Sequence, residues 1–346
     1  MALGKVILQL YIYDGLVDKS LTSTDLKYTI TKDKISTHDK INLEIAELVR
    51  DYIDVVFNDD YISITKWVKA VVTYYDDTGA LYTINNSQDT FTYLALDGYG
   101  YWEDAANPAL STNALITSNN IYLPENTAGK LPIFAEGVGK VVIDSATTDI
   151  VNASSHCRGN DGNYSANNCN DTAQKILYIT IPANSKTIQV FDTNETSLLK
   201  TITVTNICEP KFTPFKISFI NKYGATQDLY AFKKQTEVLN VTDETFNRNI
   251  IKVADSTYNT YEGEVKRYNI GGKTSITLNT GFVVEDMNTT IEELFLSQNV
   301  WIRYESKTLP VIAKSKSLNF KTSLNDKLIN YTLEFDFAFD KVNNVR

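Results

Sequence analysis

Histidine is almost missing from this chain, since its 346 residues include only His38 and His156. Histidine is the side chain that most often acts as a general base, so this scarcity leaves few catalytic schemes open. The sequence also contains no G-x-S-x-G, P-loop, H-E-x-x-H or G-x-G-x-x-G motif. We therefore predict a protein that is not an enzyme and binds no cofactor. His38 lies among charged residues and is interpreted as a surface or helix-capping residue.

Cysteine is also scarce. The three cysteines, Cys157, Cys169 and Cys208, are an odd number in a long chain and do not indicate a disulfide framework. His156, Cys157 and Cys169 offer three zinc ligands, but no fourth ligand follows at the spacing of a zinc finger. A disulfide between Cys157 and Cys169 is the better alternative for a protein that functions outside the cell.

The segment around these cysteines, residues 152–174, is rich in Asn, Asp, Ser and Gly and predicts a long polar loop. Residues 160–163 and 170–171 offer oxygen ligands for calcium. They do not match the Asp-x-Asp-x-Asp-Gly register with its closing Glu. We predict no metal site in the chain.

A run of basic residues is missing as well. The formal net charge is -9, and lysines and arginines are scattered among carboxylates. Proteins that bind nucleic acid tightly carry a basic patch, because contacts with phosphates dominate that affinity. The composition therefore argues against DNA binding, although an acidic surface still suits the wall of a channel that DNA passes through.

No apolar stretch approaches the length needed to span a bilayer. The apolar run Val6–Tyr13 is short, contains Gln9 and ends at Asp14 and Gly15, so we interpret it as a strand and not as a signal peptide. We expect a soluble protein that is made in a cytoplasm and does not enter a membrane.

Aromatic and β-branched residues are abundant, with 21 Tyr and 15 Phe. They favour pleated sheets, and short runs about ten residues apart, separated by turns, are typical of β-sandwiches and barrels. The sequence predicts a mainly β protein with two or three such domains. One amphipathic helix is expected over residues 38–57, where apolar residues follow helical spacing from Ile41 to Phe57, and a short helix over residues 289–297.

Three domains are expected: residues 1–130 with the long helix, a small β-sandwich over 131–206, and an antiparallel β domain over 207–346. The proline-marked segment 208–214 separates the last two.

Glycine-containing turns predict hairpins at residues 76–79, 222–225 and 270–273. The closing strand, residues 330–339, alternates apolar and polar side chains, which is typical of a sheet with one buried and one solvated face.

Asp97, Trp102, Glu103 and Asp104 form the one cluster in which carboxylates meet aromatic residues. A glycosidase needs two such carboxylates. The alternative, an aromatic plug at a corner of a sheet, fits the composition better. We predict an interaction surface formed by the following aromatic residues: Tyr99, Tyr101, Trp102, Tyr223 and Phe232.

Several blocks carry a family resemblance. They are LPIFAEG at 131–137, ICEPKFTPFKISFINKYGATQDLYAFKK at 207–234, IEELFLS at 291–297, VWI at 300–302 and YTLEF at 331–335. These blocks resemble virion proteins of crAss-like phages and their Bacteroidota-infecting relatives, over roughly residues 130 to 346. The resemblance implies a structural subunit that forms a ring in the neck or tail of a tailed bacteriophage. It carries no catalytic residues.

As a ring subunit, the protein would contact copies of itself, the portal and adjacent ring or tail proteins, with DNA passing nearby. Two alternatives remain: a carbohydrate- or receptor-binding β-sandwich of a tail or head fibre that uses residues 99–102, and a glycan-cleaving tail enzyme.

Overall fold

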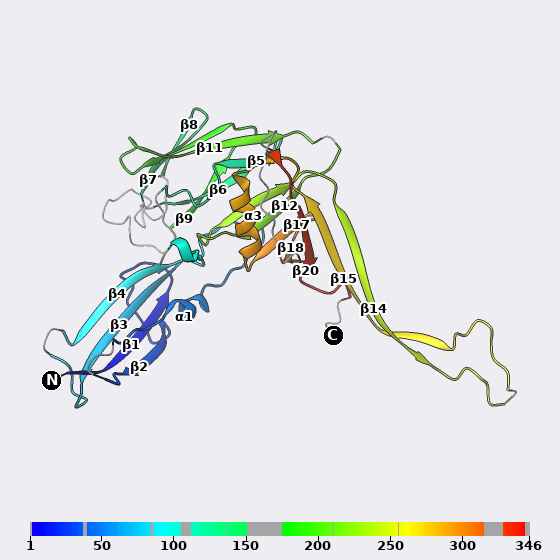
Figure 1. The fold of residues 1–346 in the computed structure, drawn as a ribbon, viewed down its shortest axis with the longest axis horizontal. Coiled ribbons are helices and arrows are strands. Elements are labelled where there is room, and N and C mark those ends of the chain that lie inside the picture. The colour runs from blue at the N-terminus through cyan, green and yellow to red at the C-terminus, as the bar shows by residue number, and fades with distance from the viewer. Residues whose placement is uncertain are drawn as a thin grey trace.

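A computed structural model of the chain describes residues 2–36, 40–83, 86–104, 112–135, 137–150, 175–209, 211–254, 256–314 and 328–342. Strands dominate these residues, and most of their pairings are antiparallel, which confirms the mainly β fold class. Three parts are visible in Figure 1: a sheet at the lower left, a larger body at the top, and a long two-stranded ribbon at the lower right. No helix in the described part of the chain is long and apolar enough to cross a membrane.

The N-terminal lobe is a four-stranded antiparallel sheet with the order β2-β1-β3-β4. Its strands are β1 (Leu3–Tyr13), β2 (Leu26–Asp33), β3 (Lys66–Asp76) and β4 (Gln88–Ala95). Alternate residues of β1, from Val6 to Ile12, are buried, because side chains point to opposite faces along a strand. The predicted turn after β3 is present, with Asp76 Oδ1 accepting hydrogen bonds from the backbone N–H groups of Thr78 and Ala80.

The long helix expected over residues 38–57 is wrong. Helix α1 covers only Ala46–Arg50, and the chain then runs irregularly to β3. Ile53 packs into the core of the lobe, whereas Phe57 packs against Ile220 and Trp301 of the body. The apolar residues of this segment are thus divided between two cores. An extended chain can reach from one core to the other because it advances about 3.3 Å per residue, whereas a helix advances about 1.5 Å.

The middle of the chain forms a five-stranded sheet with the order β5-β11-β10-β7-β8 and a two-stranded sheet of β6 and β9. The strands are β5 (Asn120–Pro124), β6 (Gly129–Phe134), β7 (Val138–Ile143), β8 (Ala146–Asp149), β9 (Ile176–Ile181), β10 (Thr187–Asp192) and β11 (Leu198–Ile207). Strand β5 lies before the expected boundary at residue 130, yet it pairs in parallel with β11. The middle unit therefore begins earlier than the sequence indicates.

A seven-stranded sheet with the order β13-β12-β17-β18-β20-β15-β14 forms the rest. Its strands are β12 (Phe215–Ile220), β13 (Thr226–Ala231), β14 (Thr236–Asn247), β15 (Val265–Asn279), β17 (Val300–Tyr304), β18 (Lys307–Ala313) and β20 (Thr332–Phe337). The two-residue strands β16 (Val283–Val284) and β19 (Leu328–Ile329) form a separate small sheet. Helix α3 (Met287–Leu296) confirms the expected short helix.

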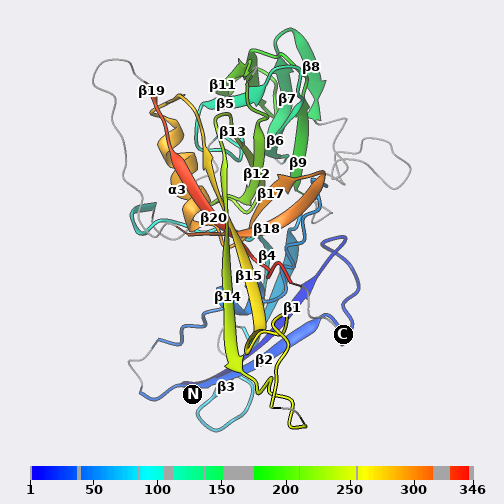
Figure 2. The same cartoon turned by 90° about the vertical axis from the view of Figure 1, so that its right-hand side faces the viewer.

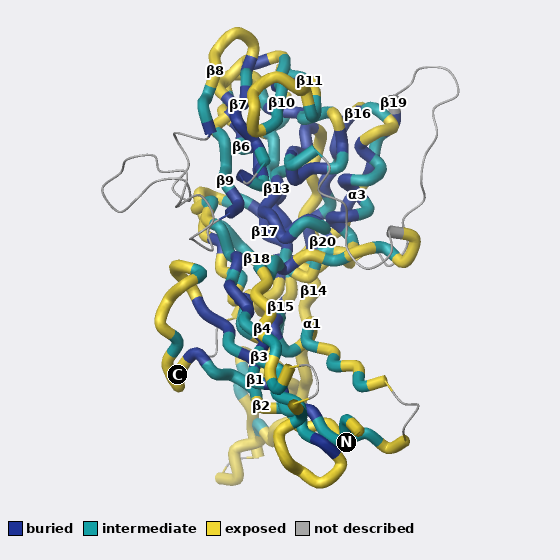
Figure 3. The backbone as a smooth tube through the Cα atoms, turned by 90° about the vertical axis from the view of Figure 1, so that its left-hand side faces the viewer, coloured by how far each residue is buried: buried dark blue, intermediate teal, exposed yellow. Residues whose placement is uncertain are grey.

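The middle and C-terminal sheets share one hydrophobic core. Val141 and Ile202 of the middle sheet and Ile217, Leu294 and Phe335 of the C-terminal part belong to the same cluster. The expected boundary at residue 207 therefore separates sheets but not cores, and we call this common unit the body. Figure 3 shows buried residues concentrated in the body and along the lobe sheet.

The hairpin expected at residues 270–273 is also wrong, because β15 runs through them without turning. Thr242 pairs with Gly271 and Glu244 with Tyr268, so Asp243 lies opposite Asn269 and Ile270. Asn269, whose φ is 49°, and Ile270 form this β-bulge, and Gly271, which pairs with Thr242, follows it. The chain turns instead between the far ends of β14 and β15 (Figure 2).

Candidate interaction surfaces

Three of the predicted contact aromatics lie together where the N-terminal lobe meets the body. The Tyr99 and Tyr101 rings are 6.0 Å apart in an edge-to-face arrangement. Lys222 Nζ lies 5.1 Å from the centre of the Tyr101 ring and 5.3 Å from that of Tyr223. Trp102, which follows Tyr101 in the chain, is 98% exposed and begins a short 3-10 helix (Trp102–Asp104). These residues form the aromatic patch: Tyr99, Tyr101, Trp102 and Tyr223.

Phe232, the fifth predicted contact residue, is not part of this patch. It is 2% exposed, and its ring packs beside Tyr230 with 6.2 Å between centroids. Tyr230 and Phe232 are two residues apart and face the same side of the chain, toward the body core. The prediction for Phe232 is therefore wrong, because the end of β13 faces inward.

Two glycines let the lobe and body backbones approach closely beneath the aromatic patch. A Cβ on Gly98 would lie 2.6 Å from Lys222 O, and one on Gly224 would lie 2.9 Å from the backbone of Asp97. Gly224 also has a φ of 74°, which L-residues adopt at a cost. The Tyr99 N–H donates to Lys222 O at 2.9 Å across this contact. Gly98, one of the glycines that break the strand pattern at residues 98–100, thus serves a close approach.

The carboxylates proposed for a sugar site occupy different environments. Asp97 is buried and accepts a hydrogen bond from Arg50 Nε at 3.1 Å, whereas Glu103 is exposed. Asp97 therefore has a structural partner within the lobe, and the structure does not present the two groups as one exposed pair.

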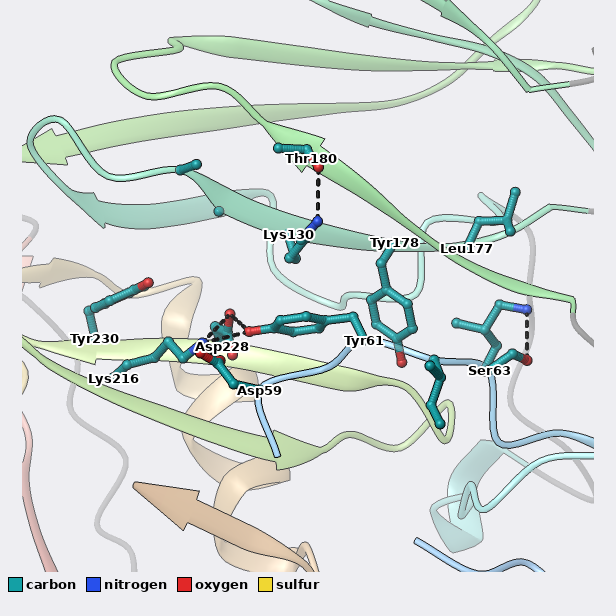
Figure 4. A pocket seen from close by; sticks show the side chains of 14 residues that line it. Asp59, Tyr61, Ser63, Lys130, Leu177, Tyr178, Thr180, Lys216, Asp228 and Tyr230 are labelled. Atoms are coloured by element: carbon teal, nitrogen blue, oxygen red, sulfur yellow. Dashed lines mark hydrogen bonds and ion pairs between the residues drawn. The ribbon is translucent and has the colours of Figure 1, made fainter. Parts of the chain in front are cut away.

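A pocket of about 660 Å³ lies where the segment before β3 meets the body (Figure 4). Tyr61 and Ser63 come from that segment, Tyr178 from β9, and Lys216 and Asp228 from β12 and β13. The Tyr61 and Tyr178 rings lie 5.4 Å apart. The pocket is a joint at which four separate stretches of chain converge, since residues 128–130 also line it.

The polar groups of this pocket satisfy one another. Asp228 accepts hydrogen bonds from the Tyr61 hydroxyl at 2.5 Å and the Ser218 hydroxyl at 2.6 Å. Lys216 Nζ lies 3.9 Å from Asp228, forms an ion pair with Asp59 and donates to the Tyr61 hydroxyl at 2.8 Å. Burial raises the pKa of Asp228, against the opposing effect of Lys216 and the two hydroxyls. Such closed pairing stabilises a joint and leaves no free nucleophile among these groups.

The sequence did not indicate this pocket. Asp59, Lys216 and Asp228 are far apart in the chain, and no local motif connects them. Alternation along β13, which places Asp228 and Tyr230 on one face, is the one signal available beforehand.

The ribbon carries many of the exposed apolar side chains in the described part of the chain. We define it as residues 239–274, the part of β14, β15 and their connection that lies beyond the pairing of β15 with β20 at Ser275–Asn279. Every residue of β14 is exposed. The ribbon exposes the following large apolar and aromatic side chains: Leu239, Val241, Phe246, Ile251, Val253, Tyr258, Tyr261, Val265, Tyr268 and Ile270.

Other predicted site residues lie outside the described residues, namely His38, His156, Cys157, Cys169 and the polar loop 152–174. Among the residues that the structure describes, no three His, Cys, Asp or Glu side chains are grouped so that they could hold a metal ion. The described cysteine, Cys208, is exposed and carries a free thiol.

The chain matches no protein-family model, no curated protein and no solved structure. Its function is therefore argued from the three surfaces above: the aromatic patch, the pocket and the ribbon.

Proposed function

We propose that this chain is a structural subunit of a tailed-phage virion, which assembles with copies of itself into a ring in the neck or tail around the DNA channel. The observation that carries the proposal is the ribbon. It projects from the body as two paired strands, as Figures 1 and 2 show. Its exposed apolar side chains lie on both faces.

A two-stranded ribbon encloses no core and is marginally stable by itself in water. Successive side chains of β14 point to opposite faces, so Phe246 lies on one face and Leu239 and Val241 on the other. Large contiguous apolar surfaces on soluble proteins mark contacts with other proteins. The ribbon is therefore best explained as an arm whose apolar side chains are covered in an assembly.

The charge of the chain supports a place beside DNA without binding to it. The net charge is -9. Carboxylates on the wall of a conduit repel phosphates over about 8 Å at physiological salt. Several Lys or Arg contacts would instead retain DNA through release of counterions.

The aromatic patch supports a second candidate, a carbohydrate- or receptor-binding protein of a tail or head fibre. Exposed Trp102 next to Tyr101 offers the flat apolar surface on which sugar rings pack. A glycan array with the wild type and with Trp102→Ala tests it: binding that the substitution abolishes would favour this candidate. Exposed Tyr258→Ala on the ribbon is the matched control.

The decisive experiment for the ring is the position of the protein in an intact particle, determined by electron microscopy. We expect closed rings in the neck or tail, in contact with the portal or with adjacent ring or tail proteins. Density in peripheral fibres, or tight binding of DNA by the assembled ring at physiological salt, would contradict the proposal.

A further inference from the structure

Two strands of the described sheets combine an open edge with exposed aromatic side chains. Strand β14 is the last strand of the seven-stranded sheet and β4 the last of the four-stranded sheet. An open edge presents unpaired backbone N–H and C=O groups, which pair readily with another strand.

Strand β4 is exposed on both faces in its middle. Thr90, Phe91, Thr92 and Tyr93 are all exposed, and the Phe91 and Tyr93 rings stack with 6.3 Å between centroids. Natural edge strands are usually protected by charge, proline or a covering segment. Thr90 to Tyr93 include neither charge nor proline, which indicates that a partner covers them.

A hollow of about 820 Å³ lies beside the inner part of β4. Its walls include Val49, Ile53, Val68 and Tyr93, so apolar side chains from a partner would find an apolar lining there. The ribbon carries exposed apolar side chains, and the hollow beside β4 offers apolar walls that they could contact.

The lengths of the two edges also agree. The part of β14 that lies in the ribbon, residues 239–247, has nine residues and extends over about 30 Å, and the eight residues of β4 extend over about 27 Å.

In Figure 1 the N-terminal lobe extends to the lower left of the body and the ribbon to the lower right, so the ribbon is directed away from the β4 of its own chain. We infer that the ribbon of one copy lies along β4 of a second copy, where the open edge of β14 extends the four-stranded sheet and ribbon side chains enter the hollow. This inference rests on the proposed function and names the partner and the contact within it. The contact joins different surfaces of identical chains, and such contacts form closed rings when the rotation between copies permits.

The test is photo-cross-linking between full-length copies. A photoreactive benzophenone amino acid replaces Val241 in protein of natural isotope content, which is mixed with ¹⁵N-labelled wild type at the highest soluble concentration and irradiated. We expect cross-linked peptides that join residue 241 of the unlabelled copy to residues 88–95 of the labelled copy.

Three labelled acceptors define the site. Phe91→Asp combined with Tyr93→Asp is expected to abolish the cross-link, and the milder pair Phe91→Ser and Tyr93→Ser to weaken it if the Asp pair does not fold. Leu198→Asp is the matched control, because Leu198 is 49% exposed, as Tyr93 is. Leu198 lies on a strand of the body and not on β4, so this substitution is expected to leave the cross-link unchanged.

Cross-links to another surface of the second copy, or no cross-links between copies at all, would overturn the inference. Either result leaves the proposed ring to be judged by the position of the protein in the particle, so the two failures are distinguishable.

Discussion

Glu293 is a carboxylate held between α3 and the segment that precedes β5. It is buried and accepts a hydrogen bond from the Thr117 hydroxyl. Burial raises the pKa of Glu293, against the opposing effects of Thr117 and Lys222. A raised pKa in the folded state means that Glu293 contributes stability below its ordinary pKa, and this contribution is lost as the pH rises through the raised value.

Glu293→Gln removes this dependence because glutamine stays neutral. We expect the free energy of unfolding of the variant to increase relative to wild type as the pH rises, by about 1.4 kcal/mol for each unit by which the pKa is raised. Urea unfolding at a series of pH values measures it. The comparison must be with wild type at each pH, because Asp25, Asp76 and Asp192 have lowered pKa values and act in the opposite direction. Parallel profiles for the two proteins would contradict the prediction.

Phe335 tests the inward face of the closing strand. It is fully buried in β20 and lies opposite Ile276 and Ala313 of the flanking strands. Phe335→Asp places an unpaired carboxylate in the core, which costs about 4 kcal/mol or more. We expect loss of the native circular dichroism spectrum of the body. Glu334→Gln, on the exposed face next to it, is the control and is expected to leave the spectrum and the stability unchanged.

Alternation identified this face from the sequence, since Tyr331, Leu333, Phe335 and Phe337 are all buried. The same rule does not apply to Phe339, which is 43% exposed because β20 ends at Phe337. It was not applied to Phe232, whose aromatic character alone suggested a contact surface. Residue type indicates what a side chain prefers, whereas its position in a strand decides where it points.

At the scale of elements, the contact between residues 97–99 and 222–224 joins the lobe to the body. We expect Gly224→Ala to lower the free energy of unfolding by about 2–4 kcal/mol, because Ala is strained at its φ of 74° and the new Cβ meets the backbone of Asp97. Gly79 is the matched control: its φ is 87°, but nothing lies within 4 Å of its Cβ position. Gly79→Ala should cost only the strain, about 1–2 kcal/mol. If urea unfolding shows that Gly224→Ala and Gly79→Ala lower the free energy of unfolding equally, the close approach of the two backbones does not contribute to stability.

Local pattern predicted most strands and the short helix α3, yet the segment 46–57 shows where it is insufficient. Helical spacing of apolar residues is present there, but Ile53 and Phe57 serve different cores. Contacts with Ile220 and Trp301, more than a hundred residues away, override the local preference. The turn expected at residues 270–273 is a similar case. Gly271 and Gly272 follow a bulge, a bulge and a turn use the same residue types, and only strand pairing distinguishes them.

For the whole molecule, composition predicted the fold class but not the arrangement of its parts. The pocket at Tyr61 combines residues from four separate stretches, and the pairing of β5 with β11 crosses an expected boundary. Both depend on which sheets share a core, and that property has no local sequence signal. The ribbon was concealed for the same reason, since the misplaced turn at residues 270–273 divided one long strand into two.

The last prediction concerns the ribbon and the stability of the body. Val241 and Gly272 are paired, so a two-residue Asn-Gly turn in place of residues 242–271 closes a short hairpin in the existing register. Gly272 is kept because its carbonyl accepts a hydrogen bond from the Lys341 N–H. The removed strand residues from Thr242 to Asn247 are all exposed and bury little in the single chain. We expect the melting temperature to stay within about 1.5 °C of wild type, which corresponds to about 1 kcal/mol for a protein of this size. Association between copies should be lost at the same time, as measured by the cross-linking assay with the benzophenone at position 241. A large fall in melting temperature would show that the ribbon supports its own chain, and retained association would place the contact between copies elsewhere.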